Sequence, residues 1–67
     1  MSDHIKLPRR SEIKKGAAVW IIEKKNYGTE NFTQGIVEEI LSPGETHLRG
    51  IKVRLTDGTV GRVWWLM

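Results

Sequence analysis

Strict alternation of apolar and polar residues from Ile51 to Leu55 predicts a β-strand with one buried and one exposed face. Ile51, Val53 and Leu55 form its apolar side, and Lys52 and Arg54 form its polar side. Because successive side chains point to opposite faces of a strand, we expect the three apolar residues in a core and the two cations in water.

The dipeptide Asp57-Gly58 follows this strand and is typical of a two-residue type I′ turn, so we expect the chain to return as a hairpin. With these two residues as the turn, the cross-strand register would place Arg62 on the core face. We therefore expect a β-bulge at Gly61, where the missing side chain permits the required backbone angles. Such a bulge would turn Val63 inward and Arg62 outward.

Two further strands are expected earlier in the chain, at residues 17–23 and 33–41. The first is apolar on both faces and rich in β-branched residues, which favours a central strand with Trp20 in the core. In the second, Val37 and Ile40 are three residues apart, so a regular strand cannot bury both of them.

A β-bulge near Glu38-Glu39 would restore the phase of the second strand and bend it, as the closure of a small barrel requires. A helix over residues 38–41 is the competing interpretation, and the nearby Gly35 and Pro43 argue against it. The two glutamates, as neighbours on a strand, are expected to point to opposite faces, which is a poor arrangement for a catalytic carboxylate pair.

The composition limits the chain to one small domain, since it has 67 residues and no cysteine for a disulfide. Trp20, one of Trp64 and Trp65, and the Ile, Val and Leu residues are expected to build the core, with the other C-terminal tryptophan at the surface or rim. Eleven Lys and Arg against eight Asp and Glu give a formal net charge of +3, which is compatible with a polyanionic partner. The N-terminus has no apolar signal segment and no run approaches the roughly 20 apolar residues of a membrane helix, so we expect a soluble cytoplasmic protein.

Side chains suited to catalysis are few in this sequence. Its only histidines are His4 and His47, and without cysteine they leave no metal-ligand cluster, so we expect no enzyme, no metal and no cofactor. His47 follows a turn, where a histidine commonly hydrogen-bonds loop backbone through one ring nitrogen.

A surface that combines cations with aromatic rings is the stronger candidate for function. Cations follow the phosphates of a single nucleic-acid strand while rings stack on its bases. Six residues are candidates for such a nucleic-acid-binding face: Lys24, Lys25, Tyr27, Lys52, Arg54 and Arg62. Alternating cations on a strand are equally expected of an ordinary solvated face, which also protects an open sheet edge from aggregation.

The most distinctive stretch of the sequence runs from His47 to Val63 and contains the alternating strand, the Asp57-Gly58 dipeptide and Gly61. This stretch resembles the YwbE-like family of small uncharacterised microbial proteins, and the resemblance extends back to Ile13. The resemblance implies a small SH3-like barrel, similar to the KOW class, and it implies no activity. The chain departs from the family pattern at Asn26-Tyr27, at Asn31-Phe32 and at Leu48.

We therefore expect an all-β fold, namely a small SH3-like antiparallel barrel of four to five strands over residues 13–67, preceded by a flexible basic arm at residues 1–12. The strands are expected at residues 17–23, 33–41, 50–56 and 59–65, with a short fifth strand at either terminus. By analogy with related barrels, the expected function is the binding of RNA or single-stranded nucleic acid by a monomer. The alternative is a protein-interaction barrel that holds an extended peptide between the first two loops, lined by Tyr27, Phe32 and a C-terminal tryptophan, or that forms a structural piece of a larger assembly.

Overall fold

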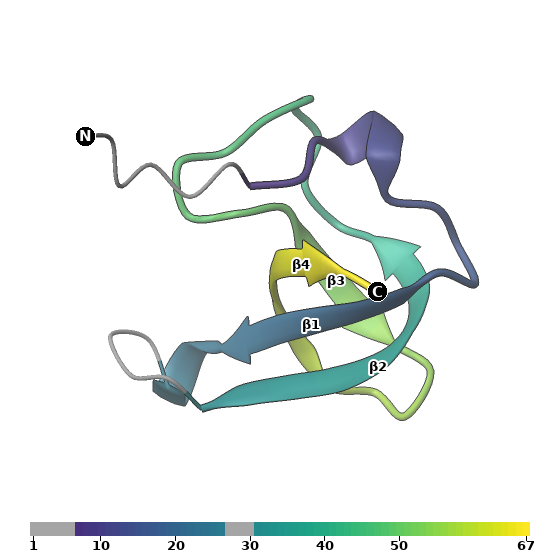
Figure 1. Ribbon diagram of the computed structural model, residues 1–67, viewed down its shortest axis with the longest axis vertical. Coiled ribbons are helices and arrows are strands. Elements are labelled where there is room, and N and C mark those ends of the chain that lie inside the picture. The colour runs from purple at the N-terminus through teal and green to yellow at the C-terminus, as the bar shows by residue number, and fades with distance from the viewer. Residues whose placement is uncertain (1–6, 27–30) are drawn as a thin grey trace.

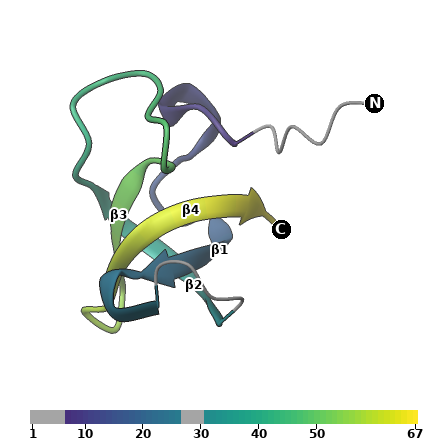
Figure 2. The same cartoon turned by 90° about the vertical axis from the view of Figure 1, so that its left-hand side faces the viewer.

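Four antiparallel strands close into a barrel in the computed structural model, which describes residues 7–26 and 31–67 (Figure 1). The elements in chain order are the 3-10 turn η1 (Arg10–Glu12), β1 (Ala18–Glu23), the 3-10 turn η2 (Lys24–Asn26), β2 (Phe32–Ile40), β3 (Lys52–Leu55) and β4 (Val60–Leu66). The strand order is β1-β2-β3-β4, and β4 pairs back with β1. Figure 2 shows β4 arching across the molecule beside β1. Neither helical turn in these described residues is long and apolar enough to cross a membrane.

The predicted all-β fold is confirmed, and the closed barrel is consistent with a small SH3-like barrel. Each predicted strand boundary lies within two residues of the observed one. Among residues 7–26 and 31–67 the chain forms these four strands and no fifth strand.

The core of the barrel is entirely aliphatic. Ile51, just before β3, and Val53 and Leu55 on β3 are at most 1 % exposed. The predicted inward face of this segment is therefore confirmed. The core cluster consists of Ile13, Val19, Ile21, Val37, Ile51, Val53, Leu55 and Val63. Strands that close tightly on one another leave room for Val, Ile and Leu side chains between them, and these fill the interior at the density that a stable core needs.

The prediction that Trp20 and one C-terminal tryptophan lie in the core is wrong, whereas the predicted surface position of the other C-terminal tryptophan is confirmed by Trp65. Val19 and Ile21 of β1 point inward, so Trp20 between them lies on the opposite, outer face, and it is only partly buried. Trp64 is likewise partly buried, and Trp65 is 44 % exposed. All three indole rings therefore lie outside the barrel.

The predicted bulge in β2 is confirmed, and the helical interpretation of residues 38–41 is wrong. The pairing of β2 with β3 shifts between Val37 and Glu39, which leaves Glu38 as the extra residue. Val37 is 1 % exposed and Ile40 packs against the core cluster, so the bulge brings both residues to the inner side.

The turn between β3 and β4 differs from the predicted type I′ turn. The Leu55 N–H donates to the Thr59 carbonyl (2.8 Å) and the Gly58 N–H donates to the Leu55 carbonyl (2.9 Å), so residues 56–58 form a three-residue connection. Gly58 has a φ of 92°, and no described non-glycine residue has a positive φ. A type I′ turn needs a positive φ at Asp57 as well, so the loop is instead the three-residue hairpin loop in which a left-handed glycine forms a bulge.

This connection sets the register of the hairpin. Val53 pairs with Gly61 and Lys52 pairs with Arg62, so Arg62 faces outward without any bulge at Gly61, and the predicted position of that bulge is wrong. Gly61 is needed for a different reason. A Cβ atom there would lie 2.6 Å from the carbonyl oxygen of Ile22, so the missing side chain allows β4 to approach β1.

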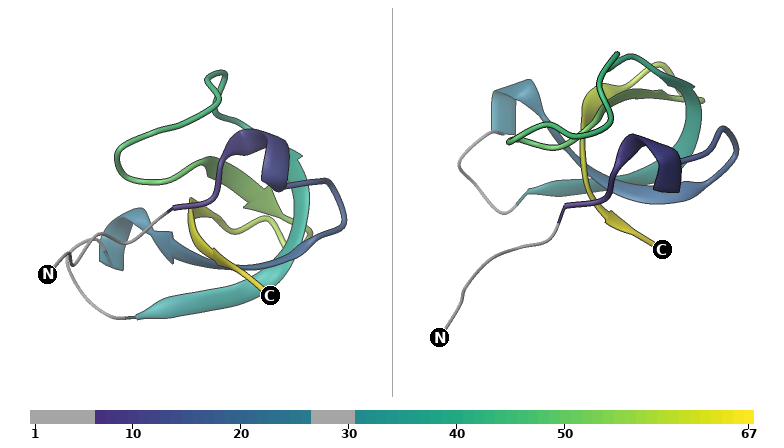
Figure 3. Two further views of the ribbon diagram at one scale, coloured as in Figure 1. Left: turned by 45° about the horizontal axis from the view of Figure 1, so that its top comes forward. Right: turned by 90° about the horizontal axis from the view of Figure 1, so that it is seen from above.

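The segment before β1 packs against the loop that joins β2 to β3, at residues 41–51. Arg10 donates from its backbone N–H to the Glu45 carbonyl (2.7 Å) and from Nε to the Ser42 carbonyl (3.0 Å). The Ser11 hydroxyl donates to the Glu45 carboxylate. Figure 3 shows η1 beside this loop. The predicted arm at residues 1–12 is thus held in place over residues 7–12, and residues 1–6 lie outside the described residues.

Candidate nucleic-acid interface

One row of residues on the outer side of the sheet crosses all four strands of the barrel, although its member on β1, Ile22, is itself buried at 4 % exposure. Ile22 on β1 partners Phe32 on β2 and, on its other side, Arg62 on β4. Arg62 in turn partners Lys52 on β3. Directly opposed residues on neighbouring strands have Cβ atoms about 4.5–5.5 Å apart, so an aromatic, an aliphatic and two basic side chains adjoin in this row.

A second outward-facing row lies two residues further back along β1. Trp20 partners Gln34 on β2 and Trp65 on β4. Residues two apart on a strand lie about 6.6–6.8 Å apart, so this row runs directly beside the first. The two rows together define an outer face that is aromatic toward one end of β4 and basic toward the other.

Three rings on this face, Phe32, Trp64 and Trp65, contact one another and form what we call the aromatic cluster. The ring centroids of Phe32 and Trp65 are 4.6 Å apart, those of Phe32 and Trp64 are 5.7 Å apart, and those of the two tryptophans are 6.1 Å apart. The ring planes are inclined by 57° to 64°, the tilted geometry that aromatic pairs favour. Trp65 is the most exposed of the three residues.

Trp64 joins this cluster because β4 carries an irregularity there. Trp65 pairs with Trp20 but Val63 pairs with Ile21, so Trp64 is an extra residue between two paired positions. The indole N–H of Trp64 is buried and has no hydrogen-bond partner among the described residues. Buried indole N–H groups are usually hydrogen-bonded, so this unpartnered donor is an exception among the described residues.

Four of the predicted cations gather around the start of β4. Lys52 is exposed, and Arg62 is held in place by a hydrogen bond from Nη1 to the Gly50 carbonyl (3.0 Å). Lys24 and Lys25 begin η2, directly after the last residue of β1, Glu23. Glu23 pairs with Gly61 near the start of β4, so the two lysines lie at that end of the barrel. The four positive side chains are Lys24, Lys25, Lys52 and Arg62.

Arg54, the fifth predicted cation, is engaged by two acidic residues of β2. Its Nε donates to Glu38 Oε1 at 2.8 Å, and its Nη2 donates to the carboxylate of Glu39. The hydrogen bond to Glu38 and the charges of both glutamates raise the pKa of Arg54 above its ordinary value. All three side chains lie on the outside, at 40–53 % exposure, so the prediction that the two glutamates point to opposite faces is wrong. The bulge at Glu38 is the cause, because it turns two consecutive side chains to one side.

Two other predictions concern loop residues. Tyr27, the sixth candidate for the binding face, lies outside the described residues. His47 accepts a hydrogen bond at Nδ1 from the backbone N–H of Arg49 (3.0 Å), which confirms the expected contact with loop backbone. Residues 7–26 and 31–67 contain no group of three or more His, Cys, Asp or Glu side chains that is placed to hold a metal ion.

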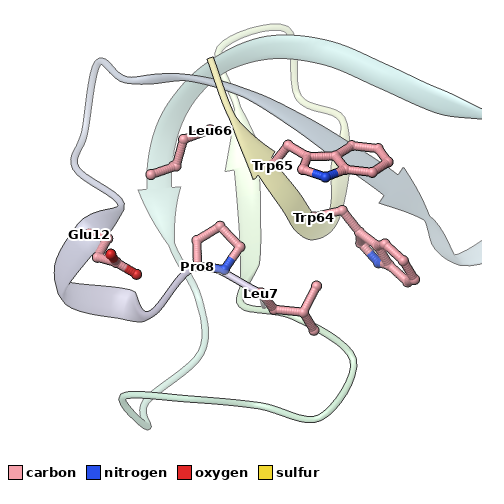
Figure 4. Close-up of a pocket in the computed structure, with 6 residues that line it drawn as sticks. All are labelled: Leu7, Pro8, Glu12, Trp64, Trp65 and Leu66. Carbon is pink, nitrogen blue, oxygen red and sulfur yellow. The ribbon is translucent and has the colours of Figure 1, made fainter. Parts of the chain in front are cut away.

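A shallow hollow adjoins the aromatic cluster on the side of the N-terminal segment (Figure 4). It has a volume of about 250 Å³ and is lined by Leu7, Pro8, Glu12, Trp64, Trp65 and Leu66. In Figure 4 the two indole rings lie on one side of the hollow and the Glu12 carboxylate on the other. The peptide cleft expected between the first two loops is a different place, because this hollow lies between residues 7–12 and the end of β4.

Trp20 was not predicted as part of the outer face, although a signal for it is present in the sequence. Val19 and Ile21 alternate with Trp20 and Ile22, and a narrow interior has room for the valine and isoleucine side chains of the first pair but not for an indole. Reading the segment as apolar on both faces concealed this alternation. The contribution of Trp64 depends on the irregularity of β4, which no local pattern indicates.

Comparison with known proteins adds the family to this description. The model of the family described as "Uncharacterized conserved protein (DUF2196)" matches residues 6–65. The chain belongs to the DUF2196 family. This DUF2196 chain is similar to the "Uncharacterized protein YwbE" of Bacillus subtilis (strain 168). The two are 45 % identical over 53 residues, which cover 79 % of this chain and 82 % of the relative. The predicted resemblance to YwbE is thereby confirmed, and no solved structure matches the chain significantly.

Proposed function

We propose that this DUF2196 chain binds single-stranded nucleic acid, and RNA above all, on the outer face formed by β1, β4 and the start of β3. The observation that supports this most is the placement of the aromatic side chains. The core cluster is built from aliphatic residues alone, while Trp65 and its two ring neighbours lie outside it, on the same outer side of the barrel as Lys52 and Arg62. A single strand needs both groups together, because its bases and its phosphates alternate along the chain.

The energetics of such a site follow from its two components. A base that stacks on an aromatic ring contributes about 1–3 kcal/mol, and Trp65, at 44 % exposure, is the most exposed ring of the aromatic cluster. Each cation that neutralises a phosphate releases counterions, and Lys52 and Arg62 lie opposite each other within reach of neighbouring phosphates. Lys24 and Lys25 extend the positive surface at the end of β1.

The closed barrel weakens the alternative that these cations only protect a sheet edge. Protective lysines are needed where a strand presents unpaired backbone groups. Here β4 pairs with β1, and Lys52 lies on β3, which pairs on both sides with β2 and β4. The barrel formed by the described strands has no open edge beside Lys52, so edge protection does not account for its charge.

Titration with an oligouridine hexamer at several salt concentrations tests the proposal. The affinity is expected to fall as salt rises, with a slope of about −0.7 in log K against log salt for every phosphate contacted. Replacing Lys24 and Lys52 by Gln is expected to reduce both the affinity and the slope. The matched control removes the same charge at Lys14 and Lys15, which are exposed and precede β1, at the opposite end from η2.

Two results would contradict the proposal. One is the absence of binding to the hexamer at low salt. The other is an equal loss of affinity in the two double variants, because that would mean a general charge effect and no defined face. Trp65→Ala provides the independent test of stacking, with an expected loss of about 1–3 kcal/mol of binding free energy.

A protein-binding function is the second candidate, and the hollow beside the aromatic cluster favours it. Its lining is mostly apolar, with Leu7, Pro8 and Leu66 next to the two tryptophans. Aromatic-lined grooves of this kind accept extended peptides. In that case Trp65→Ala would abolish binding to the partner, while salt and the lysine variants would have little effect.

A further inference from the structure

We propose that Glu38 and Glu39 withhold Arg54 from the nucleic acid and thereby set the edge of the binding face on β3. This inference rests on the proposed function and concerns the path of the bound strand. It assigns a role to an acidic pair that the proposed function leaves unused. The bound strand passes Trp65, Arg62 and Lys52 and ends before Arg54.

The register places the edge close to the basic row. Arg54 is two residues beyond Lys52 on β3, a distance of about 6.6–6.8 Å along the strand. Its partner on β2 is Glu39 and its partner on β4 is Val60. A strand that followed β3 past Lys52 would therefore meet Arg54 together with two carboxylates.

The charges of this cluster make it unfavourable to phosphate. One guanidinium and two carboxylates carry a formal net charge of −1, and both hydrogen bonds from Arg54 are charge-assisted. A phosphate that bound the remaining N–H donors of Arg54 would lie within the Debye length, about 8 Å, of the two carboxylates and would be repelled by both. Arg54 consequently offers a phosphate much less than Lys52 does, although both lie on the same outward face of β3.

The bulge in β2 is what makes the double contact possible. In a regular strand, residues 38 and 39 would point to opposite faces, and only one of them would reach Arg54. The extra residue in β2 brings both carboxylates to the outer face. Exposed ion pairs add little to stability, so the contribution of this cluster to folding does not explain why two glutamates engage one arginine.

The experiment compares three proteins in the same hexamer titration: the wild type, Glu38→Gln/Glu39→Gln, and the triple variant that also carries Arg54→Gln. The glutamine replacements keep the size of the side chains and remove their charge. Releasing Arg54 is expected to tighten binding about two- to fivefold and to steepen the salt slope by about 0.7, the value of one more phosphate contact. In the triple variant the slope is expected to return to that of the wild type.

The outcomes separate this inference from the proposed function. If the wild type binds and the double variant shows the same salt slope, Glu38 and Glu39 do not limit the binding face, while the proposed function stands. A triple variant that kept the full gain would also overturn it, because the gain would then come from net charge and not from Arg54. The absence of binding by all three proteins would remove both proposals. Urea unfolding of each variant checks that the barrel is folded, which the exposure of all three side chains leads us to expect.

Discussion

A single methyl group at Gly61 tests how closely β4 approaches β1. The Cβ of an alanine there would lie 2.6 Å from the Ile22 carbonyl oxygen and 2.8 Å from Ile21 Cδ1. A carbon atom and a carbonyl oxygen ordinarily approach to about 3.3 Å, so the two strands must separate by about 0.7 Å at this point. The nearest obstacle is backbone, which no side-chain rotation can move.

The expected cost of Gly61→Ala follows from this geometry. Overpacking of a tight core costs about 1–3 kcal/mol, and an alanine recovers about 0.4–1 kcal/mol by restricting the unfolded chain. Because the clash is with backbone, we place the overpacking term at its upper end and expect a net loss of about 2 kcal/mol or more. That is a large share of the roughly 3–10 kcal/mol that a chain of this size has at 0.05–0.15 kcal/mol per residue.

Gly35→Ala is the matched control. The contact made by its added Cβ is slightly shorter than at Gly61, but the obstacle is a side chain and not backbone. A Cβ at Gly35 would lie 2.5 Å from Leu55 Cδ1, and the next two atoms also belong to the Leu55 side chain. The end of a side chain can move by rotation, so we expect Gly35→Ala to cost less than Gly61→Ala. Urea unfolding at 25 °C, followed by circular dichroism and tryptophan emission, measures both. An equal or larger loss for Gly35→Ala would refute the distinction between backbone and side-chain obstacles.

Three further predictions concern the core and the hairpin loop. Gly58→Ala is expected to cost about 1–2 kcal/mol in urea unfolding, because the φ of 92° is unfavourable for alanine although nothing lies within 4 Å of its Cβ. Leu55→Ala is expected to cost about 2–5 kcal/mol of stability. Gly35→Ala should cost less in the Leu55→Ala background than in the wild type, because the nearest remaining side-chain atom, the Cβ of residue 55, would lie 3.5 Å from the added Cβ. The hydrogen bond from the Thr59 N–H to Asp57 Oδ1 (2.9 Å) lowers the pKa of Asp57 in the folded protein. The stability lost in Asp57→Ala should therefore be largest at neutral pH and shrink below about pH 4, where the carboxylate protonates in both the unfolded and the folded chain. Urea unfolding of both proteins at about pH 7 and about pH 3 checks this.

The strands could be predicted from the sequence because their patterns have a single physical solution. Val37 and Ile40 cannot both be buried by a regular strand, so a bulge between them was required, and the structure has it at Glu38. The hairpin loop is different, since two solutions satisfy the same pattern. A bulge at Gly61 and a bulge at Gly58 both turn Arg62 outward, and only the cross-strand pairing of Val53 with Gly61 decides between them.

The candidate site could be predicted only in part, because it depends on relations between strands. Lys52 and Arg62 were predicted as outward-facing, and the register then places them opposite each other. The engagement of Arg54 by Glu38 and Glu39 depends on which residues β2 and β3 bring together, which alternation within one strand does not contain. Each strand pattern identifies the inward and outward residues, whereas charge cancellation between neighbours is a property of the pairing.

Two irregular positions shape the outer face by the same physical means. At Glu38 the extra residue of β2 puts Glu38 and Glu39 on one side, where both engage Arg54. At Trp64 the shift in β4 lets Trp64 and Trp65 both contact a single ring of β2. A regular strand would send one member of each pair toward the narrow interior, which has no room for an indole and no partner for a carboxylate. The two irregularities therefore do more than close the barrel, because each places two like side chains together on its surface. One pair is the two glutamates that bind Arg54, and the other is the two tryptophans of the aromatic cluster.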